Sequence, residues 1–169
     1  LYDLIEHPDL VSQKIAEINQ AFFEAYDRIY EIIKDDEGGV IFDAFRLYAP
    51  GKVAKVQCDG SAMFSPDMFK QFVVPALAEQ CAWLDYSMFH LDGTQCIVHL
   101  DHLLEIPELD AIEWTPQTSL AGGGDPKWFD IYTRTRAAGK SVQIVHISPE
   151  EIPPVIDTLG PDGYYFVTH

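Results

Sequence analysis

The sequence contains few cysteines and few basic residues, and each shortage excludes a class of protein. Its three cysteines, Cys58, Cys81 and Cys96, form no CxxC pair. An odd number without paired spacing argues against a disulfide framework and fits a reducing compartment. The 11 Lys and Arg residues are outnumbered by 27 Asp and Glu residues, which gives a formal net charge of -16. Since no basic cluster offsets this field locally, we expect no nucleic acid and no membrane as a partner.

Long apolar runs and nucleotide-binding motifs are missing as well. No apolar run approaches the roughly 18 residues that a membrane helix needs, and no signal peptide is recognisable, so we expect a cytoplasmic protein. Neither a GxGxxG motif after a predicted strand nor a Walker motif occurs. The glycines at 122–124 do not closely follow a predicted strand. A lid or a plain connection is therefore favoured there over phosphate binding.

Apolar residues are abundant and make up 47% of the 169 residues. This amount is enough for one domain with a sizeable core. We therefore treat residues 1–169 as a single domain, in which residues 1–50 form a helix and a connection and residues 51–169 form repeated β/α units. The chain starts at Leu1 rather than Met and ends on an apolar strand. We expect it to be part of a longer protein.

Apolar periodicity predicts a long N-terminal helix followed by alternating strands and helices. Between Asp9 and Lys34 the apolar residues step by three or four positions, as on one face of a helix. Val40–Tyr48 is ambiguous and fits a short strand and a turn. The remaining elements alternate, with strands predicted at 52–58, 86–90, 110–114, 141–147 and 164–168 and helices at 66–84, 96–104, 126–138 and 149–159. This α/β alternation predicts a parallel sheet with right-handed crossovers.

Ionisable residues stand at the carboxyl end of every predicted strand. In parallel α/β folds these ends meet at one edge of the sheet, where ligands bind. A shared pocket of imidazoles and carboxylates suits proton transfer or a divalent metal. The residues at these ends are Asp59, His90, Asp92, Glu113 with its neighbour Trp114, His146 and His169.

His90 and Asp92 are the central pair of this prediction. They stand two residues apart, so both side chains leave the same face of the strand just before a glycine turn. In an alternative that remains open, Asp92 caps the next helix and His90 is a buried histidine bonded to the backbone. Glu113 has an alternative too, because Ile112 and Trp114 could be the pair that faces inward.

Four segments of the sequence carry a family resemblance. They are FSPDMFKQFVVPALAEQ at Phe64–Gln80, FHLDG at Phe89–Gly93, LLEIPELDAIEW at Leu103–Trp114 and the strand entry at Gly139-Lys140. In this order they resemble the uroporphyrinogen decarboxylase superfamily, which includes cobalamin-dependent methyltransferases that act on methylated corrinoid proteins. The resemblance covers Val53–His169. It implies a (β/α)8 TIM barrel, of which this chain is the C-terminal five-strand portion preceded by a long helix.

The resemblance also implies a metal site. In the methyltransferase branch, a zinc ion held by a His-x-Cys pair and a later Cys activates the acceptor thiol. His90 and Asp92 match the His-x-Cys positions, with Asp where the family has Cys, and His169 is the candidate third ligand. Asp also ligates zinc but makes a harder site than Cys, so zinc or another divalent metal is expected.

Three functions follow from these residues and this resemblance. The first is methyl transfer between a small molecule and a corrinoid carried by a partner protein, with Asp59, His90 and Asp92 as catalytic residues. The second is decarboxylation of a carboxylated tetrapyrrole. The third is a truncated barrel without catalysis that serves in oligomerisation or binding. Methyl transfer is preferred, because the negative charge and the scattered arginines do not suit a substrate with many carboxylates.

Further residues are assigned to substrate and partner binding. The predicted substrate-binding residues are Tyr86, Glu113, Trp114 and His146. Asp59 would orient the substrate, and together with Tyr86 it would touch the substrate of a decarboxylase. In the simplest alternative, Asp59 only bonds the amides of its turn. Five parallel strands that do not close leave exposed edges, so we expect a second copy of the chain or the N-terminal part of the barrel to cover them.

Overall fold

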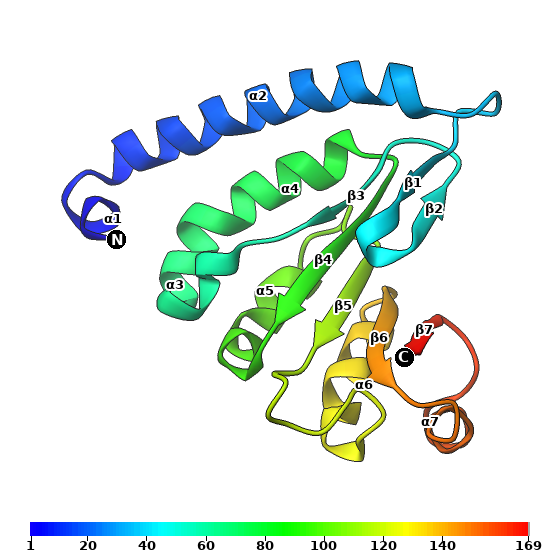
Figure 1. Cartoon of the computed structure of the whole chain (residues 1–169). Coiled ribbons are helices and arrows are strands. Elements are labelled where there is room, and N and C mark those ends of the chain that lie inside the picture. The colour runs from blue at the N-terminus through cyan, green and yellow to red at the C-terminus, as the bar shows by residue number, and fades with distance from the viewer. Residues whose placement is uncertain (169) are drawn as a thin grey trace.

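A computed structural model gives the fold of the chain and describes residues 1–168. One five-stranded sheet, parallel throughout and in the order β3-β4-β5-β6-β7, forms its centre (Figure 1). Its strands are β3 (Val53–Val56), β4 (Tyr86–Asp92), β5 (Ala111–Thr115), β6 (Ser141–Ile147) and β7 (Tyr164–Thr168). The predicted α/β alternation and parallel sheet are confirmed. Sequential strand order of this kind is compatible with part of an α/β barrel.

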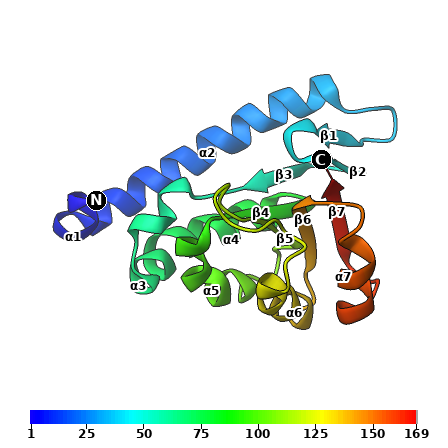
Figure 2. The same cartoon turned by 60° about the horizontal axis from the view of Figure 1, so that its bottom comes forward.

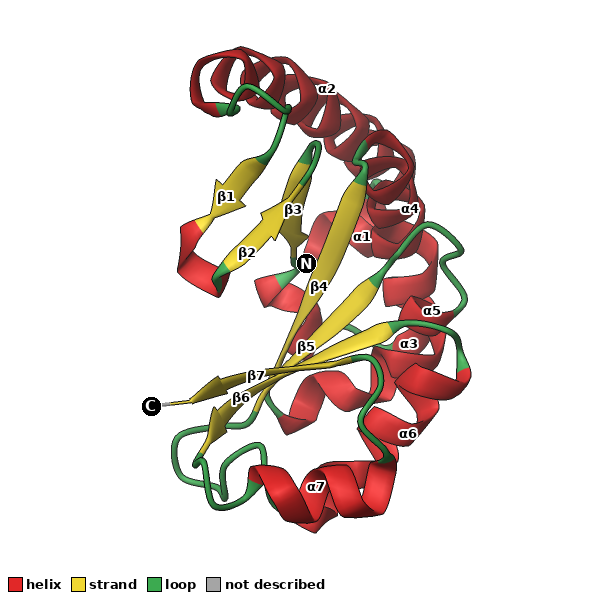
Figure 3. Cartoon of the chain, turned by 90° about the vertical axis from the view of Figure 1, so that its right-hand side faces the viewer, coloured by secondary structure: helices red, strands yellow, loops and turns green. Residues whose placement is uncertain are grey.

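The helices between the strands cover one side of the sheet (Figure 3). They are α3 (Pro66–Met68), the π-helical turn η3 (Phe69–Val73), α4 (Val74–Trp83), η4 (Thr94–His99), α5 (Leu100–Leu104), η5 (Pro126–Trp128), α6 (Phe129–Ala137) and α7 (Ile152–Leu159). Ser65 and Asp125 cap two of these segments, because their side chains accept hydrogen bonds from the amides of Met68 and Lys127. The short turn η2 (Asp59–Met63) follows β3 directly.

The side-chain alternation of the strands separates an apolar face from a polar face. On the helix side, Leu91, Trp114 and Ile144 are fully buried in the main core. On the other side, the neighbouring positions in sequence carry polar groups, among them His90 and Glu113. The strands are therefore not apolar on both faces, and the polar face is the one available to a ligand.

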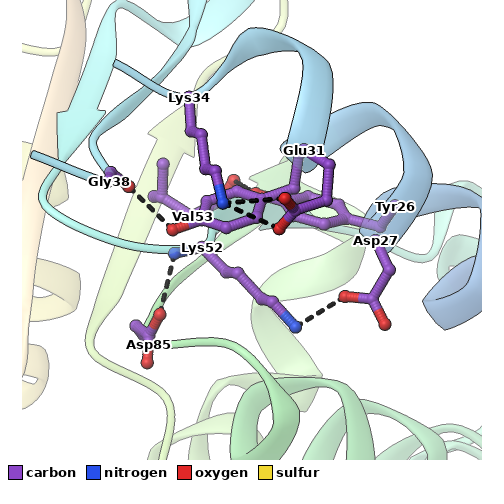
Figure 4. Close-up of polar contacts among 9 residues, drawn as sticks. Tyr26, Asp27, Glu31, Lys34, Gly38, Lys52, Val53 and Asp85 are labelled. Carbon is purple, nitrogen blue, oxygen red and sulfur yellow. Dashed lines mark hydrogen bonds and ion pairs between the residues drawn. The ribbon is translucent and has the colours of Figure 1, made fainter. Parts of the chain in front are cut away.

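The predicted N-terminal helix is present as α2 (Pro8–Ile33), which follows the single turn α1 (Tyr2–Glu6) and runs along α4 and past β3 (Figure 2). Its contacts with the start of β3 are shown in Figure 4. Tyr26 donates a hydrogen bond from its hydroxyl to Val53 O at 2.7 Å, and Lys52 Nζ lies 2.6 Å from the carboxylate of Asp27. No helix within residues 1–168 is long and apolar enough to cross a membrane.

The ambiguous segment between α2 and β3 forms a hairpin. It consists of β1 (Val40–Phe42), the turn η1 (Asp43–Phe45) and β2 (Leu47–Ala49), paired antiparallel. The hairpin lies on the side of the sheet opposite the helices (Figure 3). Arg46 ends the turn with a φ of 52°, a left-handed conformation that is uncommon for a residue with a side chain. Because the hairpin lies on the side opposite the helices, its tip faces the polar side of the strands.

Candidate functional site

Four polar side chains lie side by side across the sheet. The strand register pairs His90 with Glu113, Glu113 with Gln143, and Gln143 with Tyr165, so one residue comes from each of β4, β5, β6 and β7. We call these four residues the polar row. Neighbouring strands are about 4.8 Å apart, so side chains in adjacent positions of the row are within contact distance.

His90 and Glu113 form a hydrogen-bonded pair within the polar row. The contact joins His90 Nδ1 to Glu113 Oε2, and the second carboxylate oxygen of Glu113 accepts a hydrogen bond from the hydroxyl of Thr115. Glu113 is fully buried. A buried carboxylate is costly unless its oxygens are bonded, and here each oxygen has a partner. The buried Glu113 carboxylate therefore gives the His90 imidazole a fixed hydrogen-bond partner.

The other ring nitrogen of His90 points toward the carboxyl end of its strand. His90 Nε2 lies 4.0 Å from Asp92 Oδ2, whose side chain is exposed. Both residues line a cavity of about 290 Å³ that also includes Asp59. Asp59 is held in place by Gln57, whose amide donates a hydrogen bond to its carboxylate at 3.0 Å. The structure thus brings the three predicted catalytic residues to one cavity.

A larger cavity of about 380 Å³ lies between the hairpin tip and the polar row. Its lining residues come from the hairpin and from β4 to β7, and they are Ala44, Phe45, Arg46, His90, Glu113, Thr115, Gln143, Val145, His146, Val167 and Thr168. His90 lines this cavity and the smaller one. His90 is therefore the residue that lines both cavities, and its imidazole ring can take up or release a proton.

The hairpin tip is fixed over the polar row by two hydrogen bonds and one ring contact. Gln143 Nε2 donates to Phe45 O at 2.8 Å, and the Tyr165 hydroxyl donates to Arg46 O at 3.0 Å. The Phe45 ring meets the His90 ring edge to face, with 5.2 Å between their centroids. The tip therefore forms one wall of the larger cavity.

The remaining predicted site residues lie elsewhere or at the margin. Tyr86 begins β4, so it lies at the amino end of the strand whose carboxyl end carries His90. Trp114 points to the helix side, where it is fully buried and packs against Trp128 at 4.9 Å between ring centroids. These positions remove Tyr86 and Trp114 from the residues that a ligand in either cavity contacts.

Two histidines complete the predicted set. His146 is exposed and lines the larger cavity and a neighbouring one of about 340 Å³. Its φ of 55° coincides with an irregularity in the pairing of β6 and β7, which turns its side chain out of the regular alternation. His169, the predicted third metal ligand, lies outside the described residues.

Two of the three predicted metal ligands lie among the described residues. His90 Nε2 and Asp92 Oδ2 are two donors near one position, and the carboxylate on His90 Nδ1 is the usual outer partner of a metal-binding histidine. Within residues 1–168, no group of three or more His, Cys, Asp or Glu side chains is arranged to hold a metal ion. Zinc needs three or four protein ligands, so these two residues alone do not complete a site.

The cysteines near the site are packed rather than activated. Burial is the largest cause that raises the pKa of the Cys58 thiol above its ordinary value. Cys96 is buried with its sulfur 3.1 Å from the Ser61 hydroxyl oxygen. A reactive cysteine needs a lowered pKa, so the Cys58 thiol is not prepared as a nucleophile.

Comparisons with protein-family models, with curated proteins and with solved structures found no match. Function must therefore be argued from the geometry and from the motif resemblance. Sequence reasoning missed Arg46, Thr115 and Gln143 as members of the site. Gln143 did leave a signal, because it is a polar residue between the buried apolar residues Val142 and Ile144.

Proposed function

We propose that the chain is a small-molecule enzyme in which His90 moves a proton at the carboxyl edge of the sheet. One observation carries this proposal: His90 is bonded through Nδ1 to the buried Glu113, while Nε2 lies beside Asp92. When Nδ1–H donates a hydrogen bond to the carboxylate of Glu113, the lone pair of the neutral ring is on Nε2. That nitrogen can then act as a general base.

The motif resemblance favours methyl transfer as the reaction. In this proposal His90 Nε2 takes the proton of an acceptor thiol, and the thiolate attacks the methyl group of a methylated corrinoid, which arrives as a substrate on a partner protein. A sulfur–carbon bond forms, and the cobalt–carbon bond breaks with its electron pair staying on cobalt. Asp59 and Asp92, which share a cavity with His90, orient the acceptor.

A divalent metal is the second means of activation that we propose. Bound by His90 and Asp92, with His169 as a third ligand, such an ion would lower the pKa of the acceptor thiol. The 4.0 Å between His90 Nε2 and Asp92 Oδ2 fits two ligands of one ion. Proton transfer to His90 does not require this metal.

We also propose that the five strands are the C-terminal portion of a (β/α)8 barrel of the uroporphyrinogen decarboxylase superfamily. The supporting features are the sequential order of β3 to β7 and the helices on a single side of the sheet. In such a barrel the polar face of the sheet lines the interior, and ligands bind at the carboxyl ends of the strands. Both cavities that contain His90 lie on that face.

Decarboxylation is a second candidate, and Arg46 favours it. Arg46 and His90 line the same cavity. A guanidinium holds a carboxylate well, and a protonated imidazole could deliver a proton to the carbon that loses carbon dioxide. The carbon–carbon bond would break with its electron pair staying on that carbon until the proton arrives.

Methyl transfer from methylcobalamin to 2-mercaptoethanol, followed by the loss of methylcobalamin absorbance, tests the leading proposal. We expect the His90→Gln variant to lose roughly a hundredfold or more of the rate, as for a missing general base. His102→Gln is the control, because His102 lines neither cavity. No transfer above background by the unaltered chain contradicts methyl transfer, and release of carbon dioxide from a porphyrinogen would support the second candidate.

A further inference from the structure

We infer that the larger cavity binds a small organic acid that also carries an O–H or N–H donor, with Arg46 at the anionic group and Gln143 at the donor. This inference rests on the proposed function and names the substrate class of the same site. It concerns binding, so it holds for either proposed reaction. Gln143, which lines this cavity, has no role in the proposed chemistry.

Gln143 carries an acceptor that no group within residues 1–168 satisfies. The side chain is 2% exposed and lines the larger cavity, yet its Oε1 has no hydrogen-bond partner among the described residues. A flip of the amide would not solve this, because Nε2 is needed for its bond to Phe45 O, and an oxygen there would face another oxygen. A donor from a ligand satisfies such an acceptor, as does an ordered water molecule that a ligand can displace.

Arg46 supplies a cation at the wall of the cavity that the hairpin tip forms. Its side chain is exposed, and within residues 1–168 no carboxylate lies within 4.0 Å of its guanidinium. The hydrogen bond from Tyr165 to Arg46 O fixes the backbone of this residue at the hairpin tip. In a chain with a net charge of -16, a guanidinium at a cavity that has no carboxylate partner among the described residues is a ready site for an anionic group.

Glu113, the nearest acceptor to Gln143 along the polar row, already has partners in the chain. Both oxygens of Glu113 are occupied, one by His90 Nδ1 and the other by the Thr115 hydroxyl. A ligand donor therefore meets less competition at Gln143 than at Glu113. Apolar walls are provided by Phe45, Val145 and Val167.

The size of the cavity limits the ligand. Its volume of about 380 Å³ is near the lower end of the roughly 300–1,000 Å³ found for ligand pockets. This volume suits an acid with one small apolar group. Mandelate has these features, because it combines a carboxylate, a hydroxyl donor and a phenyl ring. Phenylacetate lacks the hydroxyl, and benzyl alcohol lacks the carboxylate, so the three compounds form a matched set.

Isothermal titration of the chain with these three probes tests the inference. We expect mandelate to bind at least about fivefold more tightly than phenylacetate and at least about fivefold more tightly than benzyl alcohol. Gln143→Met should abolish the preference over phenylacetate. Arg46→Met should abolish the preference over benzyl alcohol. Tyr48→Phe is the matched control, because it also removes a hydrogen bond of the hairpin but Tyr48 does not line the cavity.

The outcomes separate this inference from the proposed function. Equal affinity for the three probes, no measurable binding of mandelate, or a preference for the hydroxyl that survives Gln143→Met overturns the inference. If Tyr48→Phe abolishes the preferences as strongly as Gln143→Met, the effect comes from a loosened hairpin, and the inference is wrong as well. Methyl transfer that depends on His90 can persist in each of these cases. Conversely, selective binding of mandelate without methyl transfer supports the inference and contradicts the proposed methyl transfer.

Discussion

Glu113 on β5 holds the imidazole of His90 on β4, and the carboxylate that does so is fully buried. Register alone brings the two residues together, because they are direct neighbours across the parallel strands. A buried carboxylate on Nδ1 fixes both the ring orientation and the nitrogen that carries the proton. The chemical role of His90 therefore depends on a residue 23 positions away in the sequence.

Replacement of Glu113 by Gln should reduce methyl transfer by about 10–100-fold. The neutral amide no longer stabilises the positive charge that develops on the imidazole as it takes a proton. Steady-state rates of the folded variant, with its circular dichroism spectrum as a check on folding, measure the effect. Thr115→Val is the control, since it removes a donor to Glu113 but keeps the carboxylate beside His90, and it should cost less. Full activity of Glu113→Gln would show that the pair is structural.

Addition of zinc, cobalt or manganese should raise the melting temperature if the proposed metal site exists, because an ion that binds only the folded chain stabilises it by mass action. His90→Ala and Asp92→Asn should each abolish this rise. His102→Ala should not, because His102 lines neither cavity. Unchanged melting of the unaltered chain with all three ions, together with metal-free purified protein, would remove the metal from the proposal.

Acid should destabilise the fold through His99. This residue is 1% exposed, stacks on Phe69 with 4.2 Å between ring centroids and lies 2.9 Å through Nε2 from Ser61 O. Burial lowers the pKa of His99 below its ordinary value, while the hydrogen bond to Ser61 O acts in the opposite direction. The unfolded chain takes up the proton near the ordinary value of about 6.5, so this contribution is complete above that pH and is lost as the pH falls below it.

Urea unfolding at about pH 7.5 and about pH 5.5 measures this loss. His99→Gln keeps a donor for Ser61 O but does not titrate, so its free energy of unfolding should fall less between the two pH values than that of the unaltered chain. The comparison also cancels the effect of acid on the many carboxylates, which is common to both proteins. Equal pH dependence of the two proteins would show that His99 does not contribute.

We predict that the chain self-associates through the exposed apolar face of α2. Ile18, Ile29 and Ile32 on this helix are 66%, 54% and 81% exposed, which is unfavourable for a face left in water. Sedimentation at micromolar concentration should show a dimer or larger species, and an Ile29→Glu, Ile32→Glu double variant should shift it to monomer. Ser12→Glu, which adds charge at an exposed polar position of the same helix, is the control. A strictly monomeric unaltered chain would contradict the prediction.

The strands could be predicted from the sequence because their signals are local. Apolar segments bounded by turn residues gave Ser141–Ile147 and Tyr164–Thr168 with the bounds that the structure has. The pair His90 and Asp92 could be placed on one face because strand alternation has a period of two. Glu113 and Trp114 could not be assigned to a face in the same way, because burial against distant helices decides which neighbour points inward. The structure places Glu113 in the site and Trp114 in the core.

The wall formed by the hairpin could not be predicted, because it depends on contacts between distant segments. Gln143 bonds to Phe45 across 98 positions, and Tyr165 bonds to Arg46 across 119. No periodicity in Val40–Tyr48 indicates where the hairpin tip will lie. Arg46 was one of four scattered arginines in the sequence, and only the fold brings it to a cavity with His90.

The protonation state of the His90 ring tests the central claim most directly. A two-bond ¹H–¹⁵N correlation spectrum of the imidazoles, with the His90 signals assigned from their loss in His90→Gln, reports which nitrogen carries the proton. The account predicts that the neutral ring is protonated on Nδ1 and unprotonated on Nε2, because Glu113 accepts from Nδ1. A ring protonated on Nε2 with a bare Nδ1 would contradict it, since His90 could then neither take a proton from a substrate through Nε2 nor bind a metal there.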